Sequence, residues 1–534
     1  MDIEMVQLDH HGLVAGVFDQ LGIGEVIDQR IPKQKHHKLP HSLVLKAMVL
    51  NALGFVGRRL YMLPSFFEKL PVDRLLGEGV VPSDLNDDVL GRTLDAIYKY
   101  DATDLFNEIV LKVMDRLDFE TKLIHVDTTS FSVHGMYEDE DIGKTIEITL
   151  GHSKDGRMDL KQFVLSLATN QHGIPLFAEA KSGNASDKKT IAETILKLRK
   201  NLTFETSAYY IADSATYTES NIQRLGNEIK LITRVPATIN EAKELLDSDV
   251  KMTSCKDLRY SFYSTTSNYG GVSQKWVLFH SEPMQQRMEK TFQKRLEKET
   301  NAAIASLKKL KSRRFACVAD CRKEAEIWIR GHKNYKFKSL EFNAIQKRAY
   351  GKRGRPAKDE VLDTFYVICA EIEVDEESVN KLREKLGRFI LTSNDLKIDD
   401  ETMLQYYKGQ QSVERGFRFL KDRSFRIAQV YLKKEERIQA LAMIMVVTLL
   451  VYSIAEWLLR KRLRETGLTV HNQLNKPTQN PTLKWVFYLF EGVAEVKVNV
   501  MGAVHRKMMY LTDELKLIAR LLGPECEKYY CRNC

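Results

Sequence analysis

The sequence LIHVDTTSFSV, residues 123–133, has the composition of a buried β-strand. β-branched and aromatic side chains dominate it, and such residues favour the pleated surface of a sheet. Asp127 stands in the middle of this strand, where a carboxylate is rare unless it serves a purpose. The stretch therefore predicts the start of a sheet and marks Asp127 as a candidate functional residue. The alternative, for Asp127 taken alone, is the ordinary polarity of strand ends.

The segments that follow predict four more strands with helices between them. The turn at 170–173 indicates a hairpin, Thr218 is a candidate helix cap, and the fourth strand ends on Asp213. The order β-β-β-α-β-α-β is that of a ribonuclease-H-like sheet, in which the first strand lies beside the fourth. We therefore expect Asp127 and Asp213 to be near neighbours. The predicted elements are strands 162–169, 174–180, 208–212 and 231–235 and a helix at 188–200.

Residues 406–422, YYKGQQSVERGFRFLKD, predict a helix that packs on this sheet and adds a third carboxylate, Glu414. Each residue of an α-helix turns by about 100°, so side chains at matching spacings share one stripe. A solvated helix face with a Glu414–Arg418 ion pair is the alternative interpretation. The predicted stripe consists of Tyr407, Gln410, Glu414, Arg418 and Lys421.

Asp127, Asp213 and Glu414 would supply oxygen ligands for divalent cations. Mg²⁺ prefers such ligands and keeps waters and substrate phosphates in its shell. Two such ions about 4 Å apart activate an attacking oxygen and stabilise a leaving oxygen in phosphodiester displacement. The sequence therefore predicts a site for two Mg²⁺ ions.

The composition is that of a soluble globular protein with several domains. The chain has 534 residues, of which 43% are hydrophobic and 29% charged, and this length exceeds one ordinary domain. Its net charge of +9 suits a polyanionic partner. Seven scattered cysteines and an N-terminus without a signal or transit peptide predict a cytoplasmic location. Residues 440–459 are almost wholly apolar, but Glu456 interrupts them, so we expect a buried core helix and no membrane span.

Changes of pattern along the chain predict an α/β fold with five regions. Roughly 160 residues after Pro236 do not continue the sheet pattern, and they are too many for a loop. We expect them to form a β-containing insertion, in which 335–358 is a basic loop. The regions are a helical N-terminal DNA-binding region (1–118), the first part of the ribonuclease-H-like core (119–240), the insertion domain (241–395), the final catalytic helix (396–425) and a helical C-terminal region (426–534).

Several of these segments together resemble the insertion-sequence DDE transposases, in the group with a β-rich insertion. The signature of that group is Tyr, two residues, Arg, three residues, Glu, six residues, Lys. Tyr407, Glu414 and Lys421 match it, while Gln410 stands where the signature has Arg. The similarity covers residues 40–460 and includes HVDTTSFSVHG, GHSKDGRMDLKQF, IADSATYTESNI and LITRVP.

The resemblance implies a reaction and its partners. Asp127, Asp213 and Glu414 would bind two Mg²⁺ ions, for which Mn²⁺ can substitute, and Tyr407 and Lys421 would position the DNA backbone. The implied partners are DNA, as transposon terminal inverted repeats and target, and a second copy of the chain in a synaptic homodimer. Gln410 carries no charge, and Arg418 is the candidate for the missing cation. In related enzymes a Trp of the insertion holds a flipped base, and the candidates are Trp276 and Trp328, with ordinary packing as the alternative.

Other short motifs point to DNA or metal binding. Arg353 and Arg355, in the sequence RGRP, resemble the core of a minor-groove-binding AT-hook, with a solvated loop as the alternative. A basic patch at 33–38 suits DNA. Cys526, Cys531 and Cys534 could bind zinc but have no evident fourth ligand.

Two further functions stay open at this point. One is a metal-dependent nuclease of the same fold that performs no strand transfer. The other is a DNA-binding protein with an inactive site, against which the complete set of three acids argues.

Overall fold

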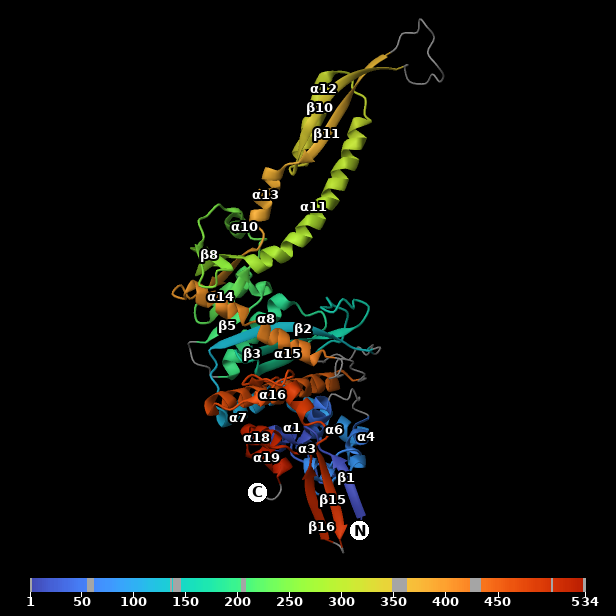
Figure 1. Cartoon of the computed structure of the whole chain (residues 1–534), viewed down its shortest axis with the longest axis vertical. Helices are drawn as coiled ribbons and strands as arrows, with labels where there is room; N and C mark the ends of the chain where they lie inside the picture. Colours follow the sequence, from blue (N-terminus) through green and yellow to red (C-terminus); the bar gives the residue numbers. More distant parts are fainter. Residues whose placement is uncertain are drawn as a thin grey trace. The chain divides into compact units, whose positions relative to one another are not determined.

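The computed structural model describes residues 2–54, 62–134, 137, 146–202, 208–347, 363–422, 434–500 and 503–531. The chain divides into two compact units, and helices and strands are mixed in both (Figure 1). Unit 1 comprises residues 1–234, 266–275 and 392–534, and unit 2 comprises residues 235–265 and 276–391.

The centre of unit 1 is a mixed sheet. Within this unit its strands follow the order β4 (Pro175–Lys181), β3 (Gln162–Asn170), β2 (Leu123–Ser132), β5 (Tyr209–Ala212) and β6 (Lys230–Val235). β2 is antiparallel to β3 and β3 to β4, whereas β2 and β5, and then β5 and β6, are parallel. The first predicted strand thus lies beside the fourth, and the predicted ribonuclease-H-like order is confirmed.

Helices form most of the rest of unit 1. Where the sequence predicted a cap at Thr218, its hydroxyl accepts a hydrogen bond from the Asn221 amide at 3.3 Å, which confirms that helix start. The helices of unit 1 are α1 (His11–Gln20), α2 (Ile23–Arg30), α3 (His41–Leu53), α4 (Leu63–Phe67), α5 (Val72–Leu76), α6 (Asp87–Tyr100), α7 (Ala102–Arg116), α8 (Asp187–Asn201), α9 (Glu219–Leu225), α14 (Asp400–Lys408), α15 (Gln411–Leu420), α16 (Glu435–Thr466), α17 (Leu483–Leu489), α18 (Asp513–Leu522) and α19 (Pro524–Tyr530), with short 3₁₀ turns at η2 (Pro82–Leu85) and η3 (Ser214–Thr216).

The two faces of the sheet are covered by different helices. β3 is buried along its whole length, and its side chains alternate between the faces. Ser166 shares a 2.7 Å hydrogen bond with Thr194 of α8. The next residue, Leu167, faces the other way, because a Cβ added to Gly416 of α15 would lie 3.6 Å from its side chain. Hence α8 covers one face and α15 the other.

α16 contains the apolar run that the sequence predicted as a core helix. It is the one helix in the described part of the chain that is long and apolar enough to cross a membrane, yet 83% of its apolar window is buried inside the protein. Glu456, the charge in this run, accepts a hydrogen bond from the Leu483 amide at 2.8 Å and pairs with Arg460 at 2.8 Å. The burial is that of a core helix, as expected.

A second sheet joins the two ends of the chain, and the sequence did not predict it. β1 (Asp2–Gln7) pairs antiparallel with β15 (Ala494–Val500), which pairs with β16 (Ala503–Met509). Both terminal regions had been expected to be helical, so these strands correct that expectation. A short pair, β13 (Val470–His471) and β14 (Pro477–Thr478), lies between α16 and α17 in the sequence.

Unit 2 contains a two-stranded sheet and a long helix. Its strands include β10 (Tyr335–Lys347), which runs antiparallel to β11 (Asp363–Val374). The sequence had assigned 335–358 to a basic loop. That expectation was wrong for β10, whose side chains alternate between polar and apolar, and residues 348–362 lie outside the described residues. The other elements that lie wholly or partly in unit 2 are α10 (Asn240–Asp247), β7 (Thr253–Ser254), β8 (Tyr260–Tyr269), β9 (Val272–Ser281), α11 (Glu282–Lys311), α12 (Val318–Gly331), α13 (Glu376–Glu384) and β12 (Arg388–Ser393), with β12, β9, β8 and β7 adjacent in that order.

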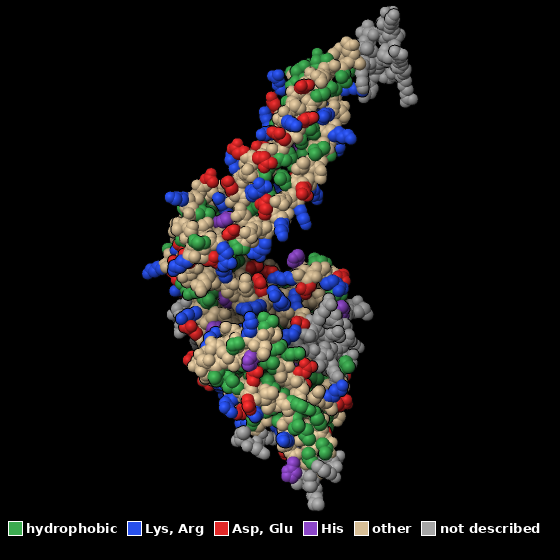
Figure 2. All heavy atoms as spheres, viewed as in Figure 1, with side chains coloured by type: hydrophobic (Ala, Val, Ile, Leu, Met, Phe, Trp, Pro, Cys, Tyr) green, Lys and Arg blue, Asp and Glu red, His purple; other side chains and the backbone are tan. Residues whose placement is uncertain are grey.

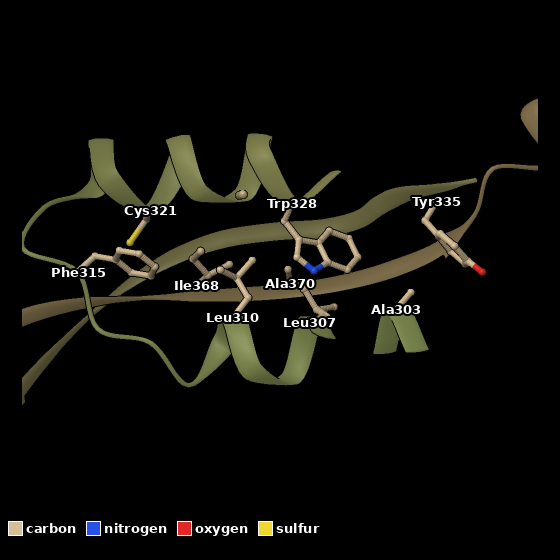
Figure 3. Close-up of a cluster of buried hydrophobic side chains, with 10 residues drawn as sticks. Ala303, Leu307, Leu310, Phe315, Cys321, Trp328, Tyr335, Ile368 and Ala370 are labelled. Atoms are coloured by element: carbon tan, nitrogen blue, oxygen red, sulfur yellow. The ribbon is translucent and has the colours of Figure 1, made fainter. Parts of the chain in front are cut away.

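The hydrophobic core of this β10–β11 region lies between the strand pair and helices α11 and α12 (Figure 3). Trp328 of α12 lies in its middle, and its indole N–H donates to Ser306 of α11 at 2.9 Å. On the face seen in the space-filling view, charges of both signs are intermingled (Figure 2). The core residues are Ala303, Leu307, Leu310, Phe315, Cys321, Ala325, Trp328, Tyr335, Ile368 and Ala370.

Candidate active site

Asp127 points toward α15. In the antiparallel ladder Asp127 lies opposite Leu167, and residues opposite each other in such a pair project from the same face. Leu167 faces Gly416 of α15, so Asp127 lies on that face too. Its side chain is 17% exposed, and one carboxylate oxygen accepts the Thr128 amide at 2.7 Å.

Asp213 follows directly after β5, beside Asp127. The parallel register pairs Val126 with Ala212, so the next residue on each strand is an aspartate. One Asp213 oxygen accepts the Ala215 amide at 2.8 Å, which holds the carboxylate at the start of η3. The sheet therefore brings Asp127 and Asp213 together, as the predicted strand order required.

Glu414 reaches the site from α15 and is exposed. Its carboxylate forms no hydrogen bond or ion pair with any residue that the structure describes, and the alternative Glu414–Arg418 pair is not among the described contacts. Burial raises the pKa of Tyr407, and the positive charge of Arg234 opposes this rise. The carboxylates of Asp213, Glu414 and Asp127 raise the pKa further. All three predicted acids thus lie within electrostatic reach of one phenol.

The predicted single helix is divided into α14 and α15 at Gly409 and Gln410. Both residues keep right-handed helical dihedrals, but the Gly409 and Gln410 amides bond to carbonyls three residues back, at 3.1 Å each. A turn with this bonding holds three residues instead of 3.6. Tyr407 and Glu414 therefore belong to consecutive helices, and the angles calculated for one regular helix do not hold across this turn.

Two lysines occupy the charged part of the site. Lys421 donates to both oxygens of Asp155, at 2.8 and 2.9 Å, and lies 5.5 Å from the centre of the Phe131 ring. Lys154 lies 3.6 Å from Asp127 and 3.4 Å from Asp187.

Burial raises the pKa of Asp127 to about 6. The Lys154 ammonium and the Thr128 amide oppose this rise, and the nearby carboxylates of Asp213 and Asp187 add to it. A cation at this position would therefore relieve a crowded group of negative charges.

The donor set fits a hard divalent cation. No three His, Cys, Asp or Glu side chains among the described residues already surround a metal position. Even so, Asp127 and Asp213 each use only one carboxylate oxygen to accept a backbone amide. Their second oxygens accept no hydrogen bond from a described residue, and neither do the two oxygens of Glu414. Free carboxylate oxygens beside a phenol are the ligands that Mg²⁺ prefers.

Sequence reasoning missed three residues of this site, Lys154, Asp155 and Asp187. The first two lie in the segment GHSKDGRMDLKQF, whose sequence alone assigns no role to these charges. Asp187 begins α8, and its Oδ1 accepts the Thr128 hydroxyl at 2.6 Å. A Lys-Asp pair in a polar loop was the one signal available.

The other predicted residues have no described contact with the three acids' side chains. Arg418 is exposed on α15, and Gln410 is half-buried at the α14–α15 turn. Trp276 and Trp328 are buried in unit 2, 2% and 8% exposed, which favours the packing alternative. The thiol of Cys526 is buried and donates to the Leu13 carbonyl at 3.5 Å, so it points into the core. Arg353, Arg355 and Cys534 lie outside the described residues.

Comparison with known families agrees with this geometry. Residues 3–111 match a domain of unknown function (DUF4277), and residues 118–451 match the Transposase DDE domain. No curated protein matches the chain. Because the second match covers more than half of the 534 residues and includes the whole acidic site, the chain belongs to the DDE transposase family.

Proposed function

We propose that this protein is the transposase of an insertion sequence, which cuts the ends of its element and joins them to target DNA. The observation that carries the proposal is the grouping of Asp127, Asp213 and Glu414 around Tyr407. Family membership supports transposition in general, and this grouping supports the residues assigned to it.

In the proposed site Asp127 and Asp213 would hold divalent cations from the sheet, and Glu414 would complete the ligand set from α15. Mg²⁺ is the proposed ion, with Mn²⁺ as a substitute. Two bound ions would activate the attacking oxygen and stabilise the leaving oxygen. Tyr407 and Lys421 position the DNA backbone beside these carboxylates.

The proposed reaction has two steps. In the first, a water oxygen bonds to the phosphorus at the end of the element while the bond from phosphorus to the 3′ oxygen breaks. The water loses a proton and the 3′ oxygen gains one, which leaves a 5′-phosphate and a 3′-hydroxyl. In the second step this 3′-hydroxyl attacks a target phosphodiester, joins to it and releases a target 3′-hydroxyl.

The proposal extends to DNA contacts outside the site and to assembly. Residues 1–118 would bind the element's ends through the patch at 33–38, where Lys33, Lys35 and Lys38 are exposed. The insertion, residues 241–395, and the region 426–534 would complete the complex, with Arg353 and Arg355 on a minor groove. A second copy of the chain would bring the two ends together in the cytoplasm.

The test uses purified protein and a supercoiled plasmid that carries the gene with its flanking DNA. We expect Mg²⁺-dependent cleavage at the borders of the element, and joining when a precut 3′-hydroxyl end is supplied. Asp127→Asn, Asp213→Asn and Glu414→Gln should each reduce cleavage about 10³-fold, because several kcal/mol of transition-state stabilisation are lost. Cleavage without joining would indicate a nuclease, and unchanged cleavage in the three variants would exclude this site.

A further inference from the structure

Lys154 lies inside the acidic site, although it comes from a loop between β2 and β3. Its ammonium nitrogen is 2.6 Å from the Thr128 carbonyl oxygen and 3.1 Å from the Thr128 hydroxyl. The same nitrogen is 3.6 Å from Asp127 and 3.4 Å from Asp187. No other lysine or arginine has a described contact with Asp127.

The short contacts of the Lys154 ammonium do not use all of its N–H donors. Lysine carries three N–H donors, and Thr128 provides two acceptors at hydrogen-bond distance. The carboxylates at 3.4 and 3.6 Å are farther away than an ordinary hydrogen bond. The side chain is 33% exposed, so one donor can meet an anion that arrives from solvent.

The candidate cations of the site differ in how they are held. Arg234 acts on the phenol of Tyr407, and Lys421 is paired with Asp155. Arg418 was the candidate from sequence, but it is exposed and has no described hydrogen bond or ion pair. Lys154 is already held against Asp127.

We propose that Lys154, and not Arg418, is the cation that binds the scissile DNA phosphate in this site. The inference rests on the proposed function. Divalent cations bound at Asp127 would weaken the attraction between that carboxylate and Lys154, so a phosphate oxygen would compete well for the ammonium. A compact ammonium on a flexible stem suits phosphate, and Thr128 keeps it within reach.

The experiment compares four variants: Lys154→Met, Lys154→Arg, Arg418→Ala and, as a control, Lys189→Met, an exposed lysine of α8. Cleavage of the plasmid is measured in Mg²⁺. Lys154→Met should lose about 10²-fold in cleavage, the effect of removing one charged donor from a transition state. Lys154→Arg should stay within about tenfold of wild type, and Arg418→Ala and Lys189→Met should match wild type.

Two readouts do not depend on cleavage. Binding of a short fluorescent DNA duplex in Ca²⁺ should show a shallower dependence on salt for Lys154→Met, by about 0.9 in the logarithmic slope for one lost phosphate contact. Mn²⁺ bound without DNA, followed by electron paramagnetic resonance, should bind Lys154→Met more tightly, because a competing ammonium is gone. If the wild-type protein cuts no plasmid, the proposed function fails. The two binding measurements would still test whether Lys154 contacts a DNA phosphate.

Three outcomes would overturn the assignment. One is wild-type cleavage and salt slope in Lys154→Met, and another is an equal loss in Arg418→Ala. The third is a Lys154→Met defect with an unchanged salt slope and a lowered thermal midpoint, which would show that Lys154 only holds its loop in place.

Discussion

Lys421 donates hydrogen bonds to both carboxylate oxygens of Asp155, so the lysine proposed to contact DNA already holds an anion of its own chain. The lysine side chain is 22% exposed and the aspartate 45%. A DNA phosphate must therefore compete with Asp155 for this ammonium. Removing the Asp155 carboxylate should therefore change the affinity for DNA.

Replacing Asp155 by Asn should tighten DNA binding. Exposed ion pairs contribute up to about 1 kcal/mol, so we expect an affinity gain of about two- to fivefold, measured by fluorescence anisotropy with a short duplex. Asp159→Asn, which breaks the pair with Arg157 in the same loop, is the matched control. The gain should vanish in the double variant Asp155→Asn, Lys421→Met. Equal or weaker binding by Asp155→Asn would contradict the prediction.

Gly409→Ala should reduce both DNA cleavage and the stability of the protein. A Cβ at this position would lie 2.9 Å from Cε1 of His125, a buried ring on β2 two residues before Asp127. The collision should push the α14–α15 turn away from the sheet and separate Glu414 from Asp127. Overpacking of this kind costs about 1–3 kcal/mol. Thermal unfolding and plasmid cleavage measure the two effects.

The control for Gly409 is Gly331→Ala, because nothing lies within 4 Å of a Cβ built there. That variant should keep wild-type stability and cleavage. Wild-type cleavage by Gly409→Ala would show that the close approach to His125 does not set the position of Glu414.

Glu495→Gln should destabilise unit 1. Glu495 is fully buried on β15 and accepts a hydrogen bond from the Arg74 guanidinium of α5 at 3.0 Å. Removing one partner of a buried pair leaves the other charge uncompensated, at a cost of about 3–5 kcal/mol. Urea unfolding should show the loss as a lower midpoint. Asp513→Asn, whose ion pair with Lys516 is largely exposed, should change the free energy of unfolding by less than about 0.5 kcal/mol.

His11 should make the protein sensitive to mild acid. Burial lowers the pKa of His11 to about 4, while the ring's hydrogen bond with the Leu8 carbonyl opposes this shift. Between about pH 6.5 and pH 4 the unfolded chain binds a proton that the folded protein does not, so the free energy of unfolding decreases as the pH falls. One such group accounts for about 3 kcal/mol over this window.

His11→Asn should remove that part of the pH dependence, because an amide does not titrate but can still donate to the Leu8 carbonyl. Urea unfolding at several pH values would measure the slope, and the same substitution at exposed His36 serves as the control. An identical slope in wild type and His11→Asn would contradict the assignment.

The parts of the fold that could be predicted are those with a strong local pattern. β2, β3 and β5 are runs of β-branched and apolar residues with clear breaks, and their order alone placed Asp127 beside Asp213. α16 could be identified because an apolar run with one interior acid is typical of a core helix.

The parts that could not be predicted depend on distant contacts. β1 pairs with β15, nearly the whole chain away, and nothing in DIEMVQ specifies that partner. The many charged residues of β10 made its alternation of polar and apolar side chains hard to recognise in the sequence. Lys154 and Asp187 meet Asp127 only after the sheet has formed, and the tight turn at Gly409 depends on packing against His125. The acids and Lys421 could therefore be predicted from sequence, whereas Lys154, Asp155 and Asp187 could not.

The pairing of β1 with β15, together with the packing of α1 on α19, has a consequence for synthesis. The Tyr530 hydroxyl donates to the Asp9 carbonyl at 2.6 Å, and the start of the chain has no sheet partner until residue 494 exists. At about 5–20 residues per second, the nascent N-terminal segment waits on the ribosome for roughly half a minute or longer. During that interval the face of α1 that packs on α19 has no partner. Chains released before residue 524 would lack α19 and with it one of the partners of α1.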